Sequence, residues 1–503
     1  MFLLNSKVQC FEEQIFHRTA ISLIVIYRKD SKTSFFHSFL FRYIISHLSA
    51  NNIHIINYVS RKEFMYMNKP QIIRCSAREI LDSRGNPTVE ASVFLADGTV
   101  GMASVPSGAS TGIYEAHEKR DKNPARYGGK GVEDAVCSVC RRISPAISGI
   151  NATEQAELDR ILLQLDGTSD KSNLGANACL AVSLANARAA ANWYHLPLYR
   201  YLGGLDAHKL PVPMMNILNG GAHASNNVEI QEFMAVPVGF SRFSEALRAG
   251  SEVYHALGKL LKSKGLSTSV GDEGGFSPVL DSDEAAIELI IEAIGMAGYT
   301  TEQIRVALDA AASEWFDEES GSYALPKTGK KMTSSELVSY WQSLIDRFPV
   351  IMSVEDALDQ RDETGWADIT EKLGSRIMLV GDDLFVTNAK RLSAGIEKNI
   401  ANSILIKPNQ VGTLTETFET VHVAKNAGYR FILSHRSGDT EDTTIADIAV
   451  ALASGFIKTG APCRSERVAK YNRLLRIESS LNCSARYGFS DMPTAFPNCG
   501  FEI

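Results

Sequence analysis

Seven charged or polar side chains in the second half of the sequence close short apolar segments that precede helix-like stretches. Successive members stand 23 to 46 positions apart, and they are Glu273, Asp309, Glu355, Asp382, Lys407, His435 and Lys458. That spacing is about the length of one strand with the helix that follows it. We therefore expect the seven side chains to share one site rather than to be scattered over surface loops.

Three members of the series are acids, Asp309, Glu355 and Asp382, with no accompanying Cys or His. Carboxylate oxygens are hard ligands, and a site made of them selects Mg²⁺, Mn²⁺ or Ca²⁺ over zinc or copper. Spacing alone leaves a second interpretation open, in which the acids only neutralise Lys407 and Lys458. Burial and a nearby divalent cation both lower the pKa of a lysine, so such a lysine can act as a base.

The remaining members supply an acid and an anion site. Glu273 lies in the string GDEGG (271–275), whose glycines let a substrate approach closely. The string SHRSG (434–438) brings cationic and hydroxyl donors that suit a phosphate group. A divalent metal, a lysine base, a carboxylic acid and an anion clamp together predict removal of a proton next to a carboxylate, followed by loss of a leaving group.

The elements that position these side chains fall into two groups. Residues 71–104 read as strands with Asp97-Gly98 as a hairpin turn, and residues 132–194 show helical periodicity, which indicates a small α+β domain ending near Gly204. From Pro211 onward, continuous apolar strands alternate with helices, as in a parallel sheet buried on both faces. Closed into a barrel, such strands bring their C-terminal ends to one mouth, where the catalytic groups of these barrels lie.

Composition narrows the class of protein. The 503 residues are 45% hydrophobic and 22% charged, which suits two or three globular domains. The net charge of −7 disfavours nucleic acid as a partner, and no apolar run approaches the roughly 20 residues that span a bilayer. Eight scattered cysteines favour a reducing compartment, and the lone pair Cys137 and Cys140 is predicted to be two buried thiols on a helix.

Residues 1–66 differ from the rest of the chain, because they contain neither Gly nor Pro and carry eight basic and four acidic side chains. Three interpretations stay open: a start placed too far upstream of Met65 or Met67, a secretory signal, or an organellar transit peptide. Glu12 and Glu13 before the apolar run argue against a secretory signal. We expect this extension to contribute nothing to the site or the core, since it lacks turn-forming residues.

Nine strings in the correct order carry a resemblance to a known family. They are AREILDSRGNPTVE (77–90), SVPSGASTG (104–112), NGGAHASNNVEIQEF (219–233), GDEGGFSP (271–278), SVEDAL (353–358), VGDDLFVTN (380–388), IKPNQVGTLTET (406–417), SHRSGDTEDTTIAD (434–447) and IKTGAPCRSERVAKYN (457–472). Over about residues 70–480 the chain resembles the enolase family, and the sequences of several of these strings are similar to those of bacterial members.

The resemblance implies an α/β fold, with an α+β cap domain at 67–205 and a modified β/α barrel at 206–503 whose early strands depart from regular alternation. It also implies a lyase of glycolysis and gluconeogenesis that reversibly dehydrates 2-phosphoglycerate to phosphoenolpyruvate with two Mg²⁺ per active site. Sites of the enolase superfamily are themselves a standard example of a Lys base that works with one or two Mg²⁺ ions.

The matching strings imply a role for each site residue. Lys407 would take the C2 proton, and Glu273 would help the C3 hydroxide to leave as water. The implied metal ligands are Asp309, Glu355 and Asp382 for the first Mg²⁺ and, from a mobile loop, Ser110 for the second. The implied substrate contacts are Arg436 and Ser437 at the phosphate, Lys458 at the carboxylate, and His223, Gln231 and Glu232 near the leaving group, together with Lys407 and His435.

Partners follow from the same resemblance. It implies a homodimer or a higher homo-oligomer in the cytoplasm, with neither nucleic acid nor a membrane as a partner. A bacterial source would add a secreted or cell-surface pool, where some family members bind plasminogen through C-terminal lysines. This chain ends in Phe501-Glu502-Ile503 and lacks lysines there.

Other functions fit the residues less well. A racemase or cycloisomerase of the same superfamily would share the barrel and the metal acids, but would not be expected to carry SGASTG (107–112) together with SHRSG. A nucleotide-binding enzyme is disfavoured because no G-x-x-x-x-G-K-[ST] string occurs. A non-catalytic structural or adhesive protein would be free to lose Glu273 or Lys407, and both are present; adhesion as a second role stays open.

Overall fold

Three antiparallel strands begin the part of the chain that the structure describes. The computed structural model describes residues 69–108, 112–224 and 226–488, so the predictions for residues 1–66 lie outside it. Strands β1 (Ile72–Leu81), β2 (Pro87–Leu95) and β3 (Val100–Ser104) form a sheet in that order. Gly98 in the predicted turn between β2 and β3 has a φ of 93°, a left-handed conformation that glycine adopts without strain.

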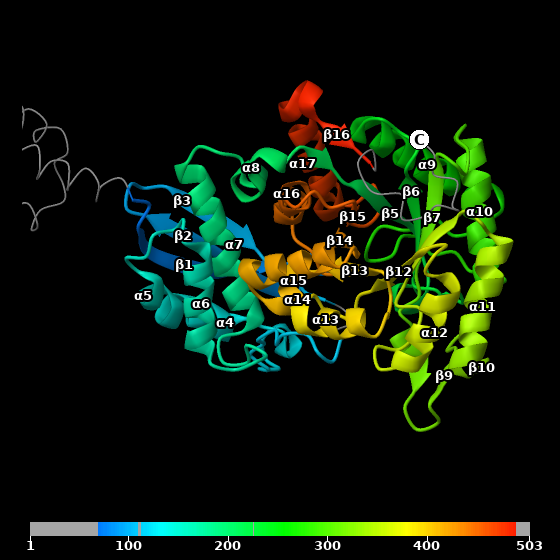
Figure 1. The fold of residues 1–503 in the computed structure, drawn as a ribbon, viewed down its shortest axis with the longest axis horizontal. Coiled ribbons are helices and arrows are strands. Elements are labelled where there is room, and N and C mark those ends of the chain that lie inside the picture. Colours follow the sequence, from blue (N-terminus) through cyan, green and yellow to red (C-terminus); the bar gives the residue numbers. More distant parts are fainter. Residues whose placement is uncertain (1–68, 109–111, 225, 489–503) are drawn as a thin grey trace, which may run out of the picture. The chain divides into compact units, whose positions relative to one another are not determined.

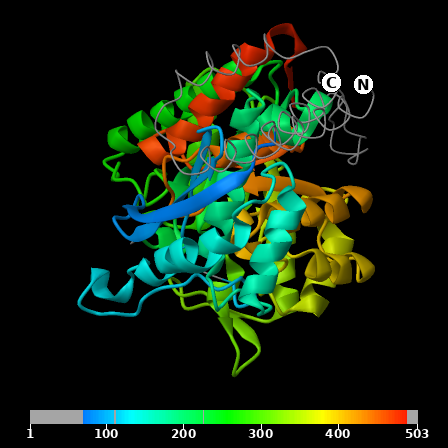
Figure 2. The same cartoon turned by 90° about the vertical axis from the view of Figure 1, so that its left-hand side faces the viewer.

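Helices pack against this sheet (Figures 1 and 2). The long α7 (Ala176–Trp193) contacts β2 and β3, and its many alanines let it lie close to them. A Cβ atom on Gly101 would stand only 2.1 Å from the backbone nitrogen of Ala189. The other helices of this domain are α4 (Glu133–Cys137), α5 (Ser144–Ile147), α6 (Gln155–Asp166) and α8 (Leu198–Gly203).

The prediction that Cys137 and Cys140 are buried thiols is wrong, because both side chains are exposed. Helix α4 continues into a π-helical turn at Ser138–Ile143, and the buried face of that turn contains Val139 and Ile143. The wider turn therefore leaves both cysteines on the solvent side. All six cysteines within the described ranges are free thiols.

A closed barrel of eight strands lies between residues 212 and 458 (Figure 1). Its strands are β5 (Val212–Asn219), β6 (Glu232–Pro237), β7 (Ile304–Asp309), β11 (Ile351–Glu355), β12 (Met378–Gly381), β13 (Ser403–Ile406), β14 (Arg430–Ser434) and β15 (Phe456–Lys458). They pair in chain order, and β15 closes the barrel on β5. Strand β6 is antiparallel to β5 and β7, whereas the remaining pairs are parallel. The chain thus has the expected cap domain followed by a modified barrel.

One predicted barrel strand is absent from the barrel. The segment before Glu273 is a loop between α9 (Phe243–Ser263) and α10 (Asp283–Met296), with only single bridges such as Val270 to Phe276. Its Ser, Thr and Gly residues offer too little apolar surface for a strand that is covered on both faces. Strands β5 and β6 complete the barrel instead, which agrees with the irregular early strands that the family resemblance implies.

The barrel helices mostly begin at polar capping residues. Thr333 and Glu336 form a reciprocal capping box at α11, and Asn388 accepts two backbone N–H groups at α13. These helices are α11 (Ser334–Arg347), α12 (Glu363–Leu373), α13 (Ala389–Glu397), α14 (Pro408–Val411), α15 (Leu414–Asn426), α16 (Thr444–Ala451) and α17 (Ser465–Leu481). Short strands form two small sheets, β8 (Phe316–Asp317), β9 (Ser322–Ala324) and β10 (Lys331–Met332), and β4 (Lys209–Leu210) with β16 (Arg486–Tyr487).

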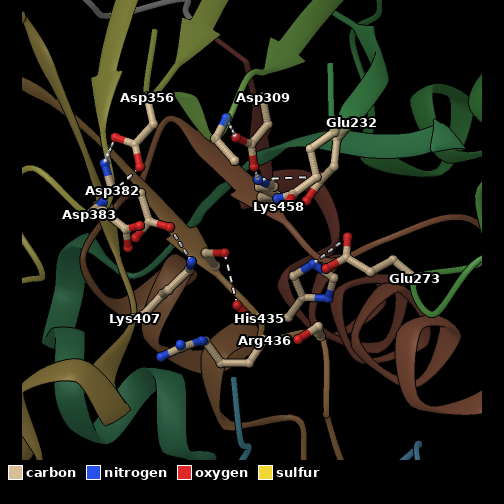
Figure 3. A pocket seen from close by; sticks show the side chains of 14 residues that line it. Glu232, Glu273, Asp309, Asp356, Asp382, Asp383, Lys407, His435, Arg436 and Lys458 are labelled. Atoms are coloured by element: carbon tan, nitrogen blue, oxygen red, sulfur yellow. Dashed lines mark hydrogen bonds and ion pairs between the residues drawn. The ribbon is translucent and has the colours of Figure 1, made fainter. Parts of the chain in front are cut away.

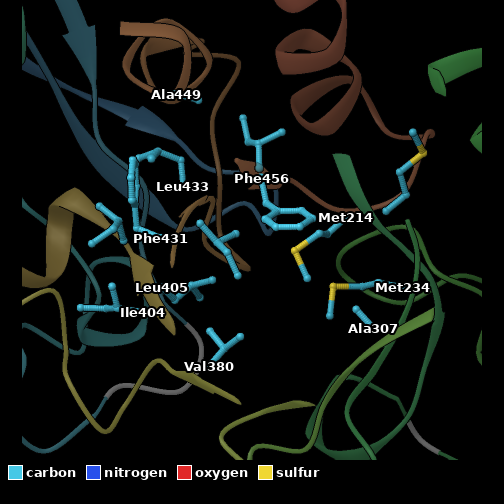
Figure 4. Close-up of a cluster of buried hydrophobic side chains, with 14 of the residues drawn as sticks. Met214, Met234, Ala307, Val380, Ile404, Leu405, Phe431, Leu433, Ala449 and Phe456 are labelled. Atoms are coloured by element: carbon cyan, nitrogen blue, oxygen red, sulfur yellow. The ribbon is translucent and has the colours of Figure 1, made fainter. Parts of the chain in front are cut away.

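The core of the barrel is apolar. Met214, Met234, Leu405 and Phe456 lie together in it, from strands far apart in the sequence (Figure 4). All four residues of β13 are buried, as expected for a strand covered on both faces. This packing holds the strand ends in fixed positions. Among the described residues, no helix is both long and apolar enough to cross a membrane.

The cap domain reaches the barrel at the loop that follows β14. Ser107 and Gly438 exchange two backbone hydrogen bonds, at 2.7 and 2.9 Å. The backbone nitrogen of Ser83 also donates to the carbonyl of Asp439 at 2.8 Å. The cap domain therefore fixes the loop that carries the predicted anion site.

Candidate active site

The ends of the barrel strands converge on one pocket (Figure 3). Asp309, Glu355 and Lys458 are the last residues of β7, β11 and β15, and Asp382 and Lys407 directly follow β12 and β13. The pocket is lined by Gln231, Glu232, Glu273, Asp309, Ala311, Asp356, Asp382, Asp383, Lys407, Ser434, His435, Arg436, Ser437 and Lys458. The structure therefore brings together side chains that are up to 227 positions apart in the sequence, from Gln231 to Lys458.

The ammonium of Lys458 stands among three buried carboxylates. Its Nζ is 2.7 Å from Asp309 Oδ2, 2.9 Å from both oxygens of Glu355, and 3.3 Å from Glu232 Oε2. Glu232 reaches this rim because β6 is antiparallel, so its first residue lies where the other strands end. All four side chains are almost completely removed from solvent.

This cluster carries more acids than cations. Burial works to lower the pKa of Lys458, but Asp309, Glu232 and Glu355 outweigh it and raise that pKa well above its usual value. Burial also raises the pKa of Glu232 and Glu355, with repulsion from neighbouring carboxylates adding to it. One ammonium cannot neutralise three ionised carboxylates, and the raised pKa values of Glu232 and Glu355 show that their full ionisation is unfavourable without a further cation. A donor set of buried carboxylate oxygens fits a hard divalent cation.

Lys407 pairs with the third predicted metal acid, Asp382. Its Nζ donates to Asp382 Oδ2, and Gln410 Nε2 donates to Asp382 Oδ1 at 2.9 Å. Burial works to lower the pKa of Lys407, but the attraction of Asp382 outweighs it and the pKa is raised. In this state Lys407 is therefore a charged partner of Asp382 rather than a free base.

A second acidic group lies beside Asp382 and was missed by reasoning from the sequence. Oxygens of Asp356, Asp382 and Asp383 all lie within 4.8 Å of one another. Asp356 has a φ of 42°, and its two oxygens accept the backbone N–H groups of Asp382 and Asp383, each at 2.9 Å. The paired acids at 355–356 and 382–383 were the available signal, since Asp356, Asp382 and Asp383 all line the pocket just after strand ends.

Glu273 is held from two sides on the same oxygen. Asn216 Nδ2, on β5, donates to Glu273 Oε2 at 3.0 Å, and His435 Nε2 is 3.3 Å from that oxygen. Burial lowers the pKa of His435 to about 4, so the ring is neutral near pH 7. Figure 3 shows His435 facing Glu273 across the pocket from Asp382.

Arg436 makes a two-pronged contact with a carboxylate from the cap domain. Its two terminal nitrogens lie 2.9 and 3.1 Å from the two oxygens of Glu115. Sequence reasoning missed Glu115, which follows the SGASTG string by three positions. Paired guanidinium donors match a phosphate as well as a carboxylate, so Arg436 has the geometry of an anion site.

The remaining predicted residues are placed as follows. Gln231 lines the pocket, and its buried Oε1 has no hydrogen-bond partner among the described residues. His223 ends a short 3-10 turn, Gly221–His223, of which the structure describes the backbone. Ser110 lies outside the described residues. The predicted roles of all these side chains remain predictions.

Comparison with models of known protein families gives two matches that follow one another along the chain. The first is described as the enolase N-terminal domain and covers residues 72–202. The second is described as the enolase C-terminal TIM barrel domain and covers residues 207–495. Together they account for both the cap domain and the barrel that carries the pocket. The chain belongs to the enolase family, whose members are lyases that use divalent metal.

Proposed function

We propose that this protein is a phosphopyruvate hydratase, which reversibly dehydrates 2-phospho-D-glycerate to phosphoenolpyruvate and water with Mg²⁺. The observation that carries the proposal is the convergence of buried carboxylates, Lys407, Glu273 and Arg436 on one pocket of an enolase-family barrel. These groups supply what the reaction needs, namely a cation site, a base, an acid and an anion site.

Substrate binding follows from the cationic groups. Arg436, with Ser437 beside it, would hold the phosphate in the place that Glu115 now takes, because both anions suit the paired guanidinium donors. Lys458 would contact the substrate carboxylate from the floor of the pocket. His223, Gln231 and Glu232 would contact the substrate from the β5–β6 side. Burial of these groups excludes water and strengthens each electrostatic contact.

Asp309, Glu355 and Asp382 would hold the first Mg²⁺, and Ser110 would contribute to the second. When bound, Mg²⁺ supplies positive charge that offsets the negative charge developing on the substrate carboxylate as the C2 proton leaves. Asp382 also holds Lys407 charged. Lys407 can accept the C2 proton only after it is released from this pairing and loses its own proton.

Glu273 would protonate the leaving C3 hydroxide. It lies on the opposite side of the pocket from Lys407, so a substrate between them can lose its proton to one and its hydroxyl to the other (Figure 3). Separate residues for the two steps mean that the steps can be tested separately.

The experiment compares Lys407→Ala, Glu273→Gln and a control, Lys372→Ala, which removes an exposed lysine paired with Asp368 on α12. Phosphoenolpyruvate formation is followed by ultraviolet absorbance, with and without chelator. Exchange of the C2 proton with deuterium is followed by NMR. We expect activity that depends on Mg²⁺, loss of exchange in Lys407→Ala, and exchange without dehydration in Glu273→Gln.

Three outcomes would contradict parts of the proposal. Full activity after metal removal would eliminate the Mg²⁺ site. Absence of any phosphoenolpyruvate formation by the metal-loaded, folded protein would eliminate the reaction itself and favour another carboxylate substrate of the enolase superfamily. Loss of exchange in Glu273→Gln to the same degree as in Lys407→Ala would overturn the separate roles.

A further inference from the structure

Arg467, in the first turn of α17, joins the two loops that carry Glu273 and Arg436. Its side chain is fully buried. One terminal nitrogen donates to His435 Nδ1 and to the carbonyl of Arg436, both at 2.6 Å. The other donates to the carbonyls of Ser437 at 2.6 Å and Asp272 at 3.2 Å. The guanidinium thus contacts both the loop of the predicted acid and the loop of the predicted anion site, although it does not line the pocket.

Gly460 leaves the space that the Arg467 side chain occupies. Gly460, just after β15, has a φ of 78°, and a Cβ atom there would lie 2.8 Å from Arg467 Cδ. Only glycine combines that backbone conformation with room for the arginine. The close packing against Gly460 therefore fixes the direction in which the Arg467 side chain extends toward His435.

The contact with Arg467 decides where the proton of His435 resides. A guanidinium has no acceptor and keeps its protons, so His435 Nδ1 must accept the hydrogen bond. In a neutral imidazole, the single proton is then on Nε2. The charged groups around the ring are Glu273, Arg467 and Asp439, and Asp439 is itself paired with Lys470 at 2.9 Å. Burial and Arg467 keep the ring neutral, with its pKa lowered to about 4.

The proton on Nε2 has a consequence for Glu273. His435 Nε2 lies 3.3 Å from Glu273 Oε2, so its N–H dipole faces an oxygen that already accepts a hydrogen bond from Asn216. The hydrogen bond from Asn216 and the facing N–H dipole of His435 make Oε2 the poorer place for a proton, so a proton on this carboxyl resides on Oε1. The orientation of the acidic proton thereby depends on Arg467, which does not line the pocket.

We infer that Arg467 is a positioning residue that fixes His435 with its proton on Nε2 and thereby directs the proton of Glu273 to Oε1. The tautomer of His435 follows from the contacts alone. The catalytic consequence rests on the proposed function, in which Glu273 is the acid.

The first test measures the tautomer in the resting, full-length protein. ¹⁵N-histidine labelling and long-range ¹H–¹⁵N correlation spectra distinguish a protonated ring nitrogen from an accepting one, and His435→Gln identifies the resonances of His435 by their loss. We expect a protonated Nε2 at pH 7 in the wild type and also in Glu273→Gln, because Arg467 rather than Glu273 sets the tautomer. A proton on Nδ1 in the wild type, or a change of tautomer in Glu273→Gln, would overturn the inference.

The second test uses Arg467→Lys, which keeps a buried cation but loses the fork of donors. We expect mixed tautomers of His435 and a fall in kcat for dehydration of roughly tenfold or more, since general acid catalysis contributes about 10²–10⁴-fold. Exchange of the C2 proton should be retained. Equal losses of exchange and dehydration would show a merely structural role. If Arg467→Lys does not fold, the spectra of the wild type and Glu273→Gln still decide whether Arg467 sets the tautomer of His435. If the wild type shows no dehydration, the inferred catalytic consequence is wrong, whereas the inference about the tautomer is unaffected.

Discussion

At the scale of residues, the site is dominated by charges that neutralise one another inside the barrel. Lys458 is the cation that three carboxylates share, so its removal is the most direct probe of the cluster. Breaking a buried ion pair from one side costs about 3 to 5 kcal/mol because uncompensated charge stays behind.

We therefore predict that Lys458→Met lowers the free energy of unfolding of the metal-free protein by about 3 to 5 kcal/mol. Mg²⁺ should restore part of this loss, because it supplies charge to the same carboxylates. Denaturant unfolding with and without Mg²⁺ measures both effects. The exposed control Lys372→Ala should change the free energy of unfolding by less than about 1 kcal/mol. Its stabilisation by Mg²⁺ should equal that of the wild type. Equal Mg²⁺ responses in the two variants would show that the metal does not bind at this cluster.

A second prediction concerns pH. The pKa of His435 is lowered from 6.5 to about 4, so the unfolded chain binds a proton between these values that the folded protein excludes. Stability contributed by the neutral ring is complete above pH 6.5 and is lost as the pH falls toward 4, by up to roughly 3 kcal/mol. His435→Gln should lose less stability over this window than the wild type, as measured by urea unfolding at a series of pH values. Parallel curves for the two proteins would contradict the prediction.

The sequence predicted residues at strand ends but not their partners across the pocket. Asp309, Asp382, Lys407 and Lys458 were found because each follows an apolar run at a regular distance. Glu115 escaped prediction because its partner Arg436 is 321 positions away, and nothing local marks the pair. Arg467 also escaped prediction, because its contacts depend on how α17 packs against the loops that contain Asp272 and His435.

At the scale of elements, the close approach of one backbone to another limits which side chains fit between them. Gly101 on β3 faces the backbone of α7, with the Ala189 nitrogen only 2.1 Å from the position of a Cβ. Gly295, in the last turn of α10, is exposed and has no atom within 4 Å of that position.

We predict opposite effects for alanine at these two glycines. Gly101→Ala should lower the melting temperature, because sheet and helix must move apart, at a cost of about 1–3 kcal/mol or more. Gly295→Ala should raise stability by about 0.5–1 kcal/mol, since alanine loses less conformational freedom in a helix. Thermal unfolding of both variants checks the pair. A neutral effect of Gly101→Ala would mean that α7 can shift away from the sheet without loss.

The parallel strands were predictable, whereas the exceptions were not. Strands β7 and β11 to β15 coincide with apolar runs, because burial on both faces leaves a continuous apolar signal. Strand β6 gives the same signal in either direction, so its antiparallel course cannot be read from apolarity. The loop at Glu273 was mistaken for a strand because Leu266 and Val270, its few apolar residues, precede a charged string, as longer apolar runs do at the true strand ends.

At the scale of the whole molecule, the cap domain and the barrel share buried and half-buried polar contacts. Asp159 on α6 accepts hydrogen bonds from the backbone and the hydroxyl of Thr415 on α15, at 3.0 and 2.6 Å. Arg188 on α7 pairs with Asp442 at 3.1 Å. Two domains joined by such contacts are expected to unfold together.

We predict a single calorimetric transition for both domains, with equal calorimetric and van't Hoff enthalpies. Asp159→Ala should lower the melting temperature without splitting the transition, at a cost of about 1–3 kcal/mol for the donors left unpaired at the start of α15. Glu157→Ala is the control on the same helix, because Glu157 is exposed and its ion pair within the described part of the chain is with Arg160, three residues on. Two separate peaks in the wild type would show that the domains fold independently.

The position of Lys458 on the last strand of the barrel sets an order for biosynthesis. The ribosome completes Glu232, Asp309 and Glu355 long before it adds Lys458, the ammonium that they share. Strand β5 likewise has no partner on one edge until β15 is made. A nascent chain that stalls before residue 458 therefore exposes two unpaired strand edges, of β5 and β14, beside three carboxylates without their ammonium. Open edges pair readily with other chains, so we expect such stalled products to be bound by chaperones or degraded rather than to refold slowly.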